Sequence, residues 1–82
     1  MDSDQILDLL TAEIGEVVPD LAGRSFTRAE SMAELGIDSI ERSEILINTL
    51  EKIGLVLPLV QLHGPRNLGE LADLIHAKLA AA

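Results

Sequence analysis

Hydrophobic residues recur every three or four positions in three stretches of the chain, a spacing that places them on one face of an α-helix. The first stretch runs until Pro19, and we predict a helix from about Asp4 to Val18 with Ser3 or Asp2 as its cap. The apolar positions of this helix are Ile6, Leu9, Leu10, Ile14, Val17 and Val18.

Two further helices follow from the same pattern and from residues suited to helix ends. Asp38 is a good cap for a second helix over Ser39–Ile53, and Gly54 suits the left-handed turn that often follows a helix. Asn67 caps a last helix, and Glu70 three residues later predicts a capping box, in which the two residues exchange hydrogen bonds. The last helix is lined by Leu68, Leu71, Ala72, Leu74, Ile75 and Leu79.

The connections complete the predicted architecture. Between Pro19 and Asp38 the helical spacing is lost, and a loop of about 20 residues inside a small domain usually has a function. Leu55–Pro58 is expected to be extended or turn-like, because a residue before proline is disfavoured in a helix. A short helical turn is expected over Leu59–His63. The prediction is one all-α domain over residues 1–82, a four-helix bundle with three main helices, one short third helix and a long first loop.

The composition excludes several classes of function. The 82 residues include 14 acidic and 6 basic side chains, and a formal charge of -8 opposes binding to nucleic acid. The chain has no cysteine, so disulfides and thiolate metal sites are ruled out, and a reducing, cytoplasmic location is expected. Membrane insertion is not expected, because the chain starts with acidic residues and no apolar run approaches the roughly 20 residues that span a bilayer.

The candidate chemistry lies at the start of the second helix. Asp38 and Glu41 have the spacing of a capping box, so Ser39 is predicted to be the first helical residue. Gly36 allows a sharp turn before it, and Ile37, together with Leu35, offers an apolar anchor for the loop. Free N–H groups and the helix dipole at this position favour an anion, so a phosphate ester on Ser39 would be well placed.

These residues carry a family resemblance. The run Leu35–Ile40 resembles the signature of acyl carrier proteins, and with Arg42 and Glu44–Leu46 it is most similar to carriers of polyketide and polyunsaturated fatty acid synthases. The resemblance implies that a phosphopantetheinyl transferase attaches 4'-phosphopantetheine to Ser39, next to the Asp38 cap. The thiol of that arm would hold acyl groups as thioesters for a ketosynthase, an acyltransferase or other synthase enzymes. It implies a non-catalytic, monomeric protein.

The second helix also offers a candidate docking surface. Periodicity alone allows two buried arcs. One is Ser43, Leu46, Ile47, Leu50 and Ile53, and the other is Ile45, Leu46, Thr49 and Ile53, which the resemblance favours as core. Partner enzymes would then contact the outer face, with basic side chains for the carboxylates and a groove for the apolar residues. This face consists of Ile40, Ser43, Glu44, Ile47 and Glu51, and Glu41 is also predicted to bind partners. The alternative is that Ile47 is core and the glutamates are merely solvated.

The sequence departs from the family pattern in three places. Ser43 replaces a usual aliphatic residue, and the Leu59–His63 segment lacks the acidic run of many carriers, so an acidic contact there is in doubt. The chain also lacks tryptophan, which marks carriers that serve β-branching enzymes, so the sequence does not support that role.

Other functions find less support. The main alternative is an unmodified, carrier-like helical module that binds a protein and holds no arm. His63 and His76 lack metal-ligand spacing, and no metal site is predicted. A hydrolase would need a histidine beside Ser39, and the Gly-x-Ser-x-Gly turn of serine hydrolases is absent.

Overall fold

The computed structural model describes residues 1–82 and contains three α-helices, two short 3-10 helices and no strand. In chain order the elements are α1 (Ser3–Val17), η1 (Pro19–Leu21), α2 (Ser39–Ile53), η2 (Leu59–Leu62) and α3 (Leu68–Ala81). The predicted all-α fold, with three main helices, a short helical segment before the last one and a long first loop, is confirmed.

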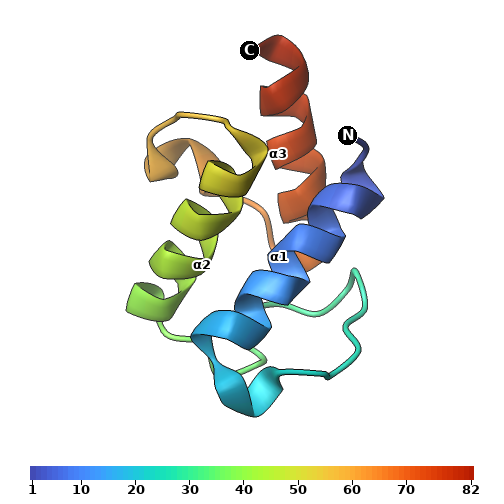
Figure 1. The fold of residues 1–82 in the computed structure, drawn as a ribbon, viewed down its shortest axis with the longest axis vertical. Helices are drawn as coiled ribbons and strands as arrows, with labels where there is room; N and C mark the ends of the chain where they lie inside the picture. The colour runs from blue at the N-terminus through green and yellow to red at the C-terminus, as the bar shows by residue number, and fades with distance from the viewer.

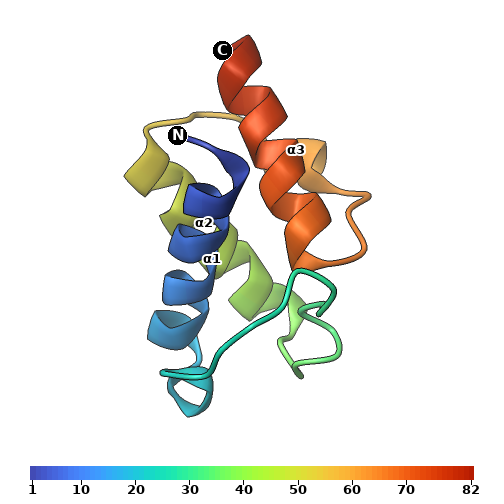
Figure 2. The ribbon, with the colours of Figure 1, turned by 90° about the vertical axis from the view of Figure 1, so that its right-hand side faces the viewer.

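Helix α1 packs against both α2 and α3, and η2 contacts the same two helices (Figure 1). The predicted loop from Pro19 begins with the short helix η1, and residues 22–38 form the long first loop. It leaves the lower end of α1, passes the start of α3 and returns to the start of α2 (Figure 2). No helix combines the length and apolar character that crossing a membrane requires.

One hydrophobic core holds the helices together. Each helix contributes fully buried side chains, such as Leu10 from α1, Leu46 from α2 and Ile75 from α3. The first loop adds Met32 and Ile37, which are 6% and 7% exposed. The loop is therefore packed against the helices through apolar contacts.

The helix ends agree with the sequence to within one residue. Helix α1 starts and ends one residue earlier than expected, with Asp2 as its cap, and α2 has the predicted bounds. Gly54 takes the predicted left-handed conformation, at φ 79°. The short segment η2 ends one residue before the predicted His63.

The predicted capping box of Asn67 and Glu70 is wrong, because only one of its two hydrogen bonds is present. Asn67 does accept a hydrogen bond from the N–H of Glu70, at 2.8 Å. The Glu70 carboxylate, however, accepts from Arg66 N at 3.0 Å and not from Asn67 N. Asn67 has φ -148°, whereas the closed box at Asp38 has φ -79°, so the backbone turns the Asn67 N–H away from Glu70.

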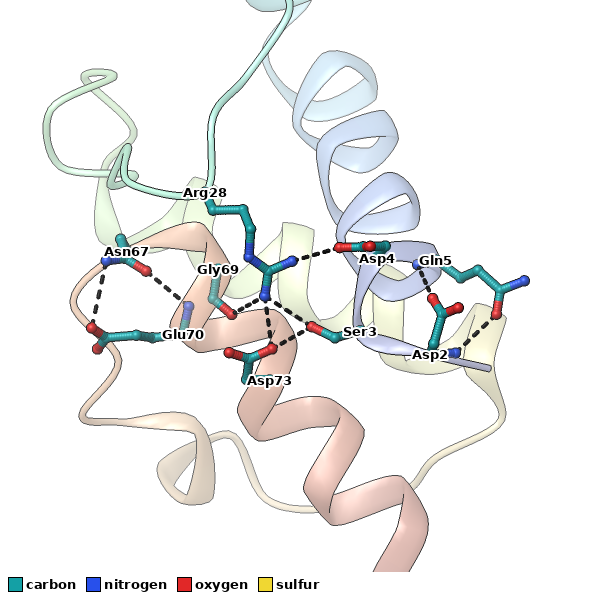
Figure 3. Close-up of polar contacts among 9 residues, drawn as sticks. All are labelled: Asp2, Ser3, Asp4, Gln5, Arg28, Asn67, Gly69, Glu70 and Asp73. Carbon is teal, nitrogen blue, oxygen red and sulfur yellow. Dashed lines mark hydrogen bonds and ion pairs between the residues drawn. The ribbon is translucent and has the colours of Figure 1, made fainter.

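The sequence did not predict how the first loop is fixed. Arg28 lies between the first turns of α1 and α3 (Figure 3). Its guanidinium is 2.8 Å from Asp4 Oδ1 and 2.7 Å from Asp73 Oδ1, and it also donates to the Gly69 carbonyl. Ser3 Oγ accepts from Arg28 Nη2 at 3.0 Å and donates to Asp73. We call these five residues the Arg28 cluster.

Gly69 allows the loop to lie this close to α3. A Cβ atom at position 69 would be 2.8 Å from Arg28 Cβ, closer than real Cβ atoms approach, and 3.1 Å from Arg28 O, a tight contact. The Gly69 N–H also donates to Arg28 O at 2.9 Å. The middle of the loop is thus held by backbone and side-chain contacts, which leaves its last residues to form the approach to α2.

Candidate functional site

Ser39 is the first residue of α2, and its side chain is exposed. The predicted capping box is present: Asp38 Oδ1 accepts from Glu41 N at 2.8 Å, and Glu41 Oε1 accepts from Asp38 N at 3.1 Å. The Ser39 hydroxyl itself takes part in none of the hydrogen bonds within the protein. The capping box therefore fixes the backbone around a hydroxyl that stays free to react.

The approach to Ser39 is a tight turn anchored in the core. Gly36 has φ 77°, a conformation that suits glycine, and its N–H donates to Ala33 O at 3.1 Å. Ile37 is buried, and its N–H donates to Met32 O at 3.0 Å. Leu35 is half-buried against the core, so both predicted apolar anchors are in place.

The first turn of α2 has two unbonded donors. The N–H groups of Ser39 and Ile40 find no acceptor in the protein, and Glu41 N is taken by the cap. Free donors at a helix start, with about half a positive charge from the helix dipole, favour a negative group at Ser39. A phosphate ester fits these surroundings.

A cleft of about 350 Å³ opens beside Ser39. Its polar lining includes Asp38, Arg42 and Arg66, and its apolar lining includes Met32, Ala33, Ile37, Leu68 and Leu71. No histidine lines the cleft, so nothing in it matches a Ser-His-Asp triad. The space is next to the hydroxyl and is bounded by the first loop, α2 and the start of α3.

Helix α2 buries one side and exposes the other. Ile45, Leu46 and Thr49 are fully buried, as the favoured arc predicted, and Ile53 is half-buried. Leu50, which belonged to the rejected arc, is only 5% exposed and is also core. The core side is therefore wider than predicted.

The outer face of α2 carries apolar and acidic side chains. Ile40 is 79% exposed and Ile47 is 45% exposed, so the alternative that Ile47 is core is wrong. Glu44 and Glu51 are exposed beside them. Ser43 differs from these residues, since it is half-buried and its hydroxyl donates to Ser39 O at 2.9 Å.

An apolar groove continues from this face, and the sequence reasoning missed it. The groove has a volume of about 410 Å³ and is lined by Ile47, Leu50, Glu51, Gly54, Leu55, Val56, Leu57 and Leu59. Val56 is 98% exposed, and Val60 nearby in sequence is 65% exposed. The only sequence signal was an apolar run between Gly54 and Pro58 that has no helical spacing.

Opposite charges join α1 to the end of α2. Lys52 forms an ion pair with Glu13, a carboxylate that is almost fully buried. The hydrogen bond that Lys52 donates to the Glu13 carboxylate raises the pKa of Lys52 above its ordinary value. Glu44 and Glu51 are not in any ion pair, so their charges remain available on the outer face.

Comparisons with known proteins identify the family. No family model matches the sequence. The chain is 39% identical to a polyketide biosynthesis acyl-carrier-protein, AcpK, of Bacillus subtilis (strain 168), over 82 residues and the full length of both chains. It also matches a chain in the crystal structure of the curacin biosynthetic pathway HMG synthase in complex with an acetyl donor acyl carrier protein. That match has a TM-score of 0.89 and 36% identity and covers 94% of this chain and 99% of the other. As the motif around Ser39 predicted, the chain belongs to the acyl carrier protein family.

Proposed function

We propose that Ser39 carries 4'-phosphopantetheine and that residues 1–82 act as one carrier domain of polyketide-type biosynthesis. The observation that carries this proposal is the free, exposed Ser39 hydroxyl at a helix start with two unbonded N–H donors. A phosphopantetheinyl transferase would form the phosphoester from coenzyme A. When bound, the arm supplies the thiol that this cysteine-free chain lacks.

The protein's own contribution is presentation and not catalysis. Asp38 and Glu41 hold the first turn of α2, so the backbone that carries the Ser39 hydroxyl keeps one position for an approaching enzyme. Ile37 anchors the preceding turn in the core. Such a rigid support reduces the conformational entropy that is lost when a partner binds.

We further propose an HMG synthase as one partner, with this chain as the donor of an acetyl group. The support is the 36% identity to the acetyl donor carrier in the curacin HMG synthase complex. An HMG synthase joins an acetyl carbon to a β-carbonyl and so creates a branch. The missing tryptophan argued against a role with β-branching enzymes, and the proposal departs from that expectation.

The docking surface is proposed to be the outer face of α2, made by Ile40, Glu44, Ile47 and Glu51. Unpaired carboxylates beside exposed aliphatic side chains suit a partner that has basic residues around an apolar pocket. Glu41 lies at the edge of this face, but its carboxylate is held by the cap. The transferase, ketosynthase and acyltransferase predicted as partners would use the same face.

Intact-mass measurement tests the attachment. The protein is incubated with coenzyme A, Mg²⁺ and a promiscuous phosphopantetheinyl transferase. We expect a mass gain of one phosphopantetheine in the wild type and none in Ser39→Ala. No gain on the folded protein, or an equal gain in the variant, would contradict the proposal and favour the unmodified interaction module.

Charge reversal tests the docking surface. Glu44→Lys and Glu51→Lys should each slow acetyl transfer to an HMG synthase by about three- to tenfold, mainly through weaker association at low salt. Asp8→Lys is the matched control, because Asp8 is exposed on α1 and outside this face. Equal rates in all three variants would overturn the assignment of the surface. The predicted monomeric state is checked by light scattering on the same samples.

A further inference from the structure

The basic side chains of this acidic protein divide into two groups. Arg24 pairs with Glu30 at 2.7 Å, Arg28 pairs with Asp4 and Asp73, and Lys52 pairs with Glu13. The other three basic residues of the six are in no ion pair, although the chain has 14 carboxylates. These three are Arg42, Arg66 and Lys78.

Two of the unpaired cations line the cleft beside Ser39. Arg42 lies in the first turn of α2, and its only hydrogen bond from the side chain is a long one of 3.5 Å to Leu62 O. Arg66 lies just before the cap of α3, and its guanidinium makes no hydrogen bond within the protein. The one carboxylate in the cleft lining is Asp38, whose Oδ1 accepts from Glu41 N.

We propose that Arg42 and Arg66 bind the phosphodiester of the arm on Ser39 and so hold the arm in the cleft between transfers. This inference rests on the proposed attachment at Ser39. A guanidinium offers paired donors that match phosphate oxygens, and such charge-assisted bonds are about twice as strong as neutral ones. The free N–H groups of Ser39 and Ile40 add donors on the same side of the phosphate.

The apolar lining gives the cleft a second role. Met32, Ile37, Leu68 and Leu71 also line the cleft, and the parts of these side chains that face it suit the less polar part of the arm. The geometry therefore assigns opposite duties to two parts of α2. Its outer face binds enzymes through carboxylates, and the cleft side retains the arm through arginines until an enzyme takes it up.

Phosphorus NMR of the modified protein tests this directly. Intact mass first establishes that each sample carries the arm, so a failed attachment is distinguished from a failed retention. In the wild type we expect the ³¹P chemical shift to differ from that of the same phosphodiester on a proteolytic peptide that contains modified Ser39. The difference should fall to about half in Arg42→Gln and in Arg66→Gln and nearly vanish in the double variant, because each loses a charge-assisted bond.

Matched variants separate this site from a general charge effect. Lys78→Gln removes the third unpaired cation, at the far end of α3, and should leave the ³¹P shift unchanged. Arg42→Lys keeps the charge without the fork of donors and should retain only part of the shift difference. In about 1 M NaCl, where the screening length is about 3 Å, the wild type should approach the double variant.

A second readout follows the arginines themselves. The Nε–Hε resonances of Arg42 and Arg66 should move when the arm is attached, whereas those of Arg24 and Arg28, which are held by carboxylates, should not. Circular dichroism confirms that the variants remain folded. If the modified wild type and the folded double variant give the same ³¹P shift, retention by the arginines is wrong, while the attachment at Ser39 stands.

Discussion

The starts of α2 and α3 have the same local sequence signal and opposite surroundings. In each, a cap side chain accepts from the N–H three residues later at 2.8 Å. At α3 the next two donors are also taken, since Leu68 N donates to Glu30 O and Gly69 N donates to Arg28 O. At α2 the equivalent donors, Ser39 N and Ile40 N, are free.

The side chains at these positions differ in the same way. Leu68, the first residue of α3, is 1% exposed, whereas Ser39, the first residue of α2, is exposed. Gly69 is buried under the first loop, whereas Ile40 is 79% exposed. The capping residues set where each helix begins, and the loop determines which start is open to a partner. The first loop covers the start of α3, so of these two helix starts only that of α2 is open to a partner.

The largest expected difference in the free energy of unfolding is between substitutions of Leu68 and Ser39, the first residues of the two helices. Leu68→Ala removes a fully buried side chain and should lower the free energy of unfolding by about 2–5 kcal/mol. Ser39→Ala should change it by less than about 0.5 kcal/mol, because the side chain is exposed and unbonded. Urea denaturation of both variants measures the difference. Similar losses would show that the start of α2 is also part of the core.

Gly69 and Ile40, the second residues of the two helices, give the next largest difference in the free energy of unfolding. Gly69→Ala places a Cβ atom 2.8 Å from Arg28 Cβ and should cost about 1–3 kcal/mol from overpacking. Ile40→Ala should change the free energy of unfolding by less than about 0.5 kcal/mol. Ala77→Gly, at an exposed position of α3, gives the intrinsic helix preference, which is about 1 kcal/mol and favours alanine. A stabilised Gly69→Ala would mean that the loop moves away without cost.

The cap of α2 should have a moderate effect. Asp38→Ala removes the acceptor of Glu41 N and should cost about 1 kcal/mol, with faster hydrogen exchange in the first turn of α2. Asp38→Asn keeps an acceptor and should cost only a few tenths of a kcal/mol by the same measurement. Equal exchange rates in both variants would show that packing of Ile37, and not the cap, fixes this turn.

Local patterns were enough to predict the helices and the Ser39 site. The bounds of α2 depend on Asp38 at one end and Gly54 at the other, and both signals act within a few residues. The Ser39 motif is equally local, so its capping box could be predicted from spacing alone. Even so, periodicity did not decide between the two arcs of α2, and Leu50, which lies on the arc that the resemblance disfavoured, is also buried.

The missed features depend on residues far apart in the sequence. Arg28 contacts Asp4, 24 positions away, and Asp73, 45 positions away. Each of these charges alone is typical of a solvated surface, and only a glycine inside the first turn of α3 hinted at a close approach. Likewise, Val56 is exposed because of how the chain leaves α2, which no spacing rule describes.

The smallest expected effect is the loss of folding free energy in acid through the Arg28 cluster. This cluster keeps the start of α3 covered. The hydrogen bond from Ser3 and the nearby Arg28 lower the pKa of Asp73 below its ordinary value of 3.8. A lowered pKa in the folded state means that this stabilisation is present at neutral pH and is lost as the pH falls through the lowered value. Because the residues are exposed, salt also weakens it.

Asp73→Asn should therefore be less stable than the wild type at neutral pH, and the two stability curves should converge in acid. Asp8 is an exposed aspartate outside the ion pairs, so the stability curve of Asp8→Asn should run parallel to that of the wild type. Urea denaturation across the acid range gives the slopes. If Asp73→Asn also runs parallel, the carboxylate adds nothing to the cover over α3, and the difference between the two helix starts rests on Gly69 and the backbone bonds alone.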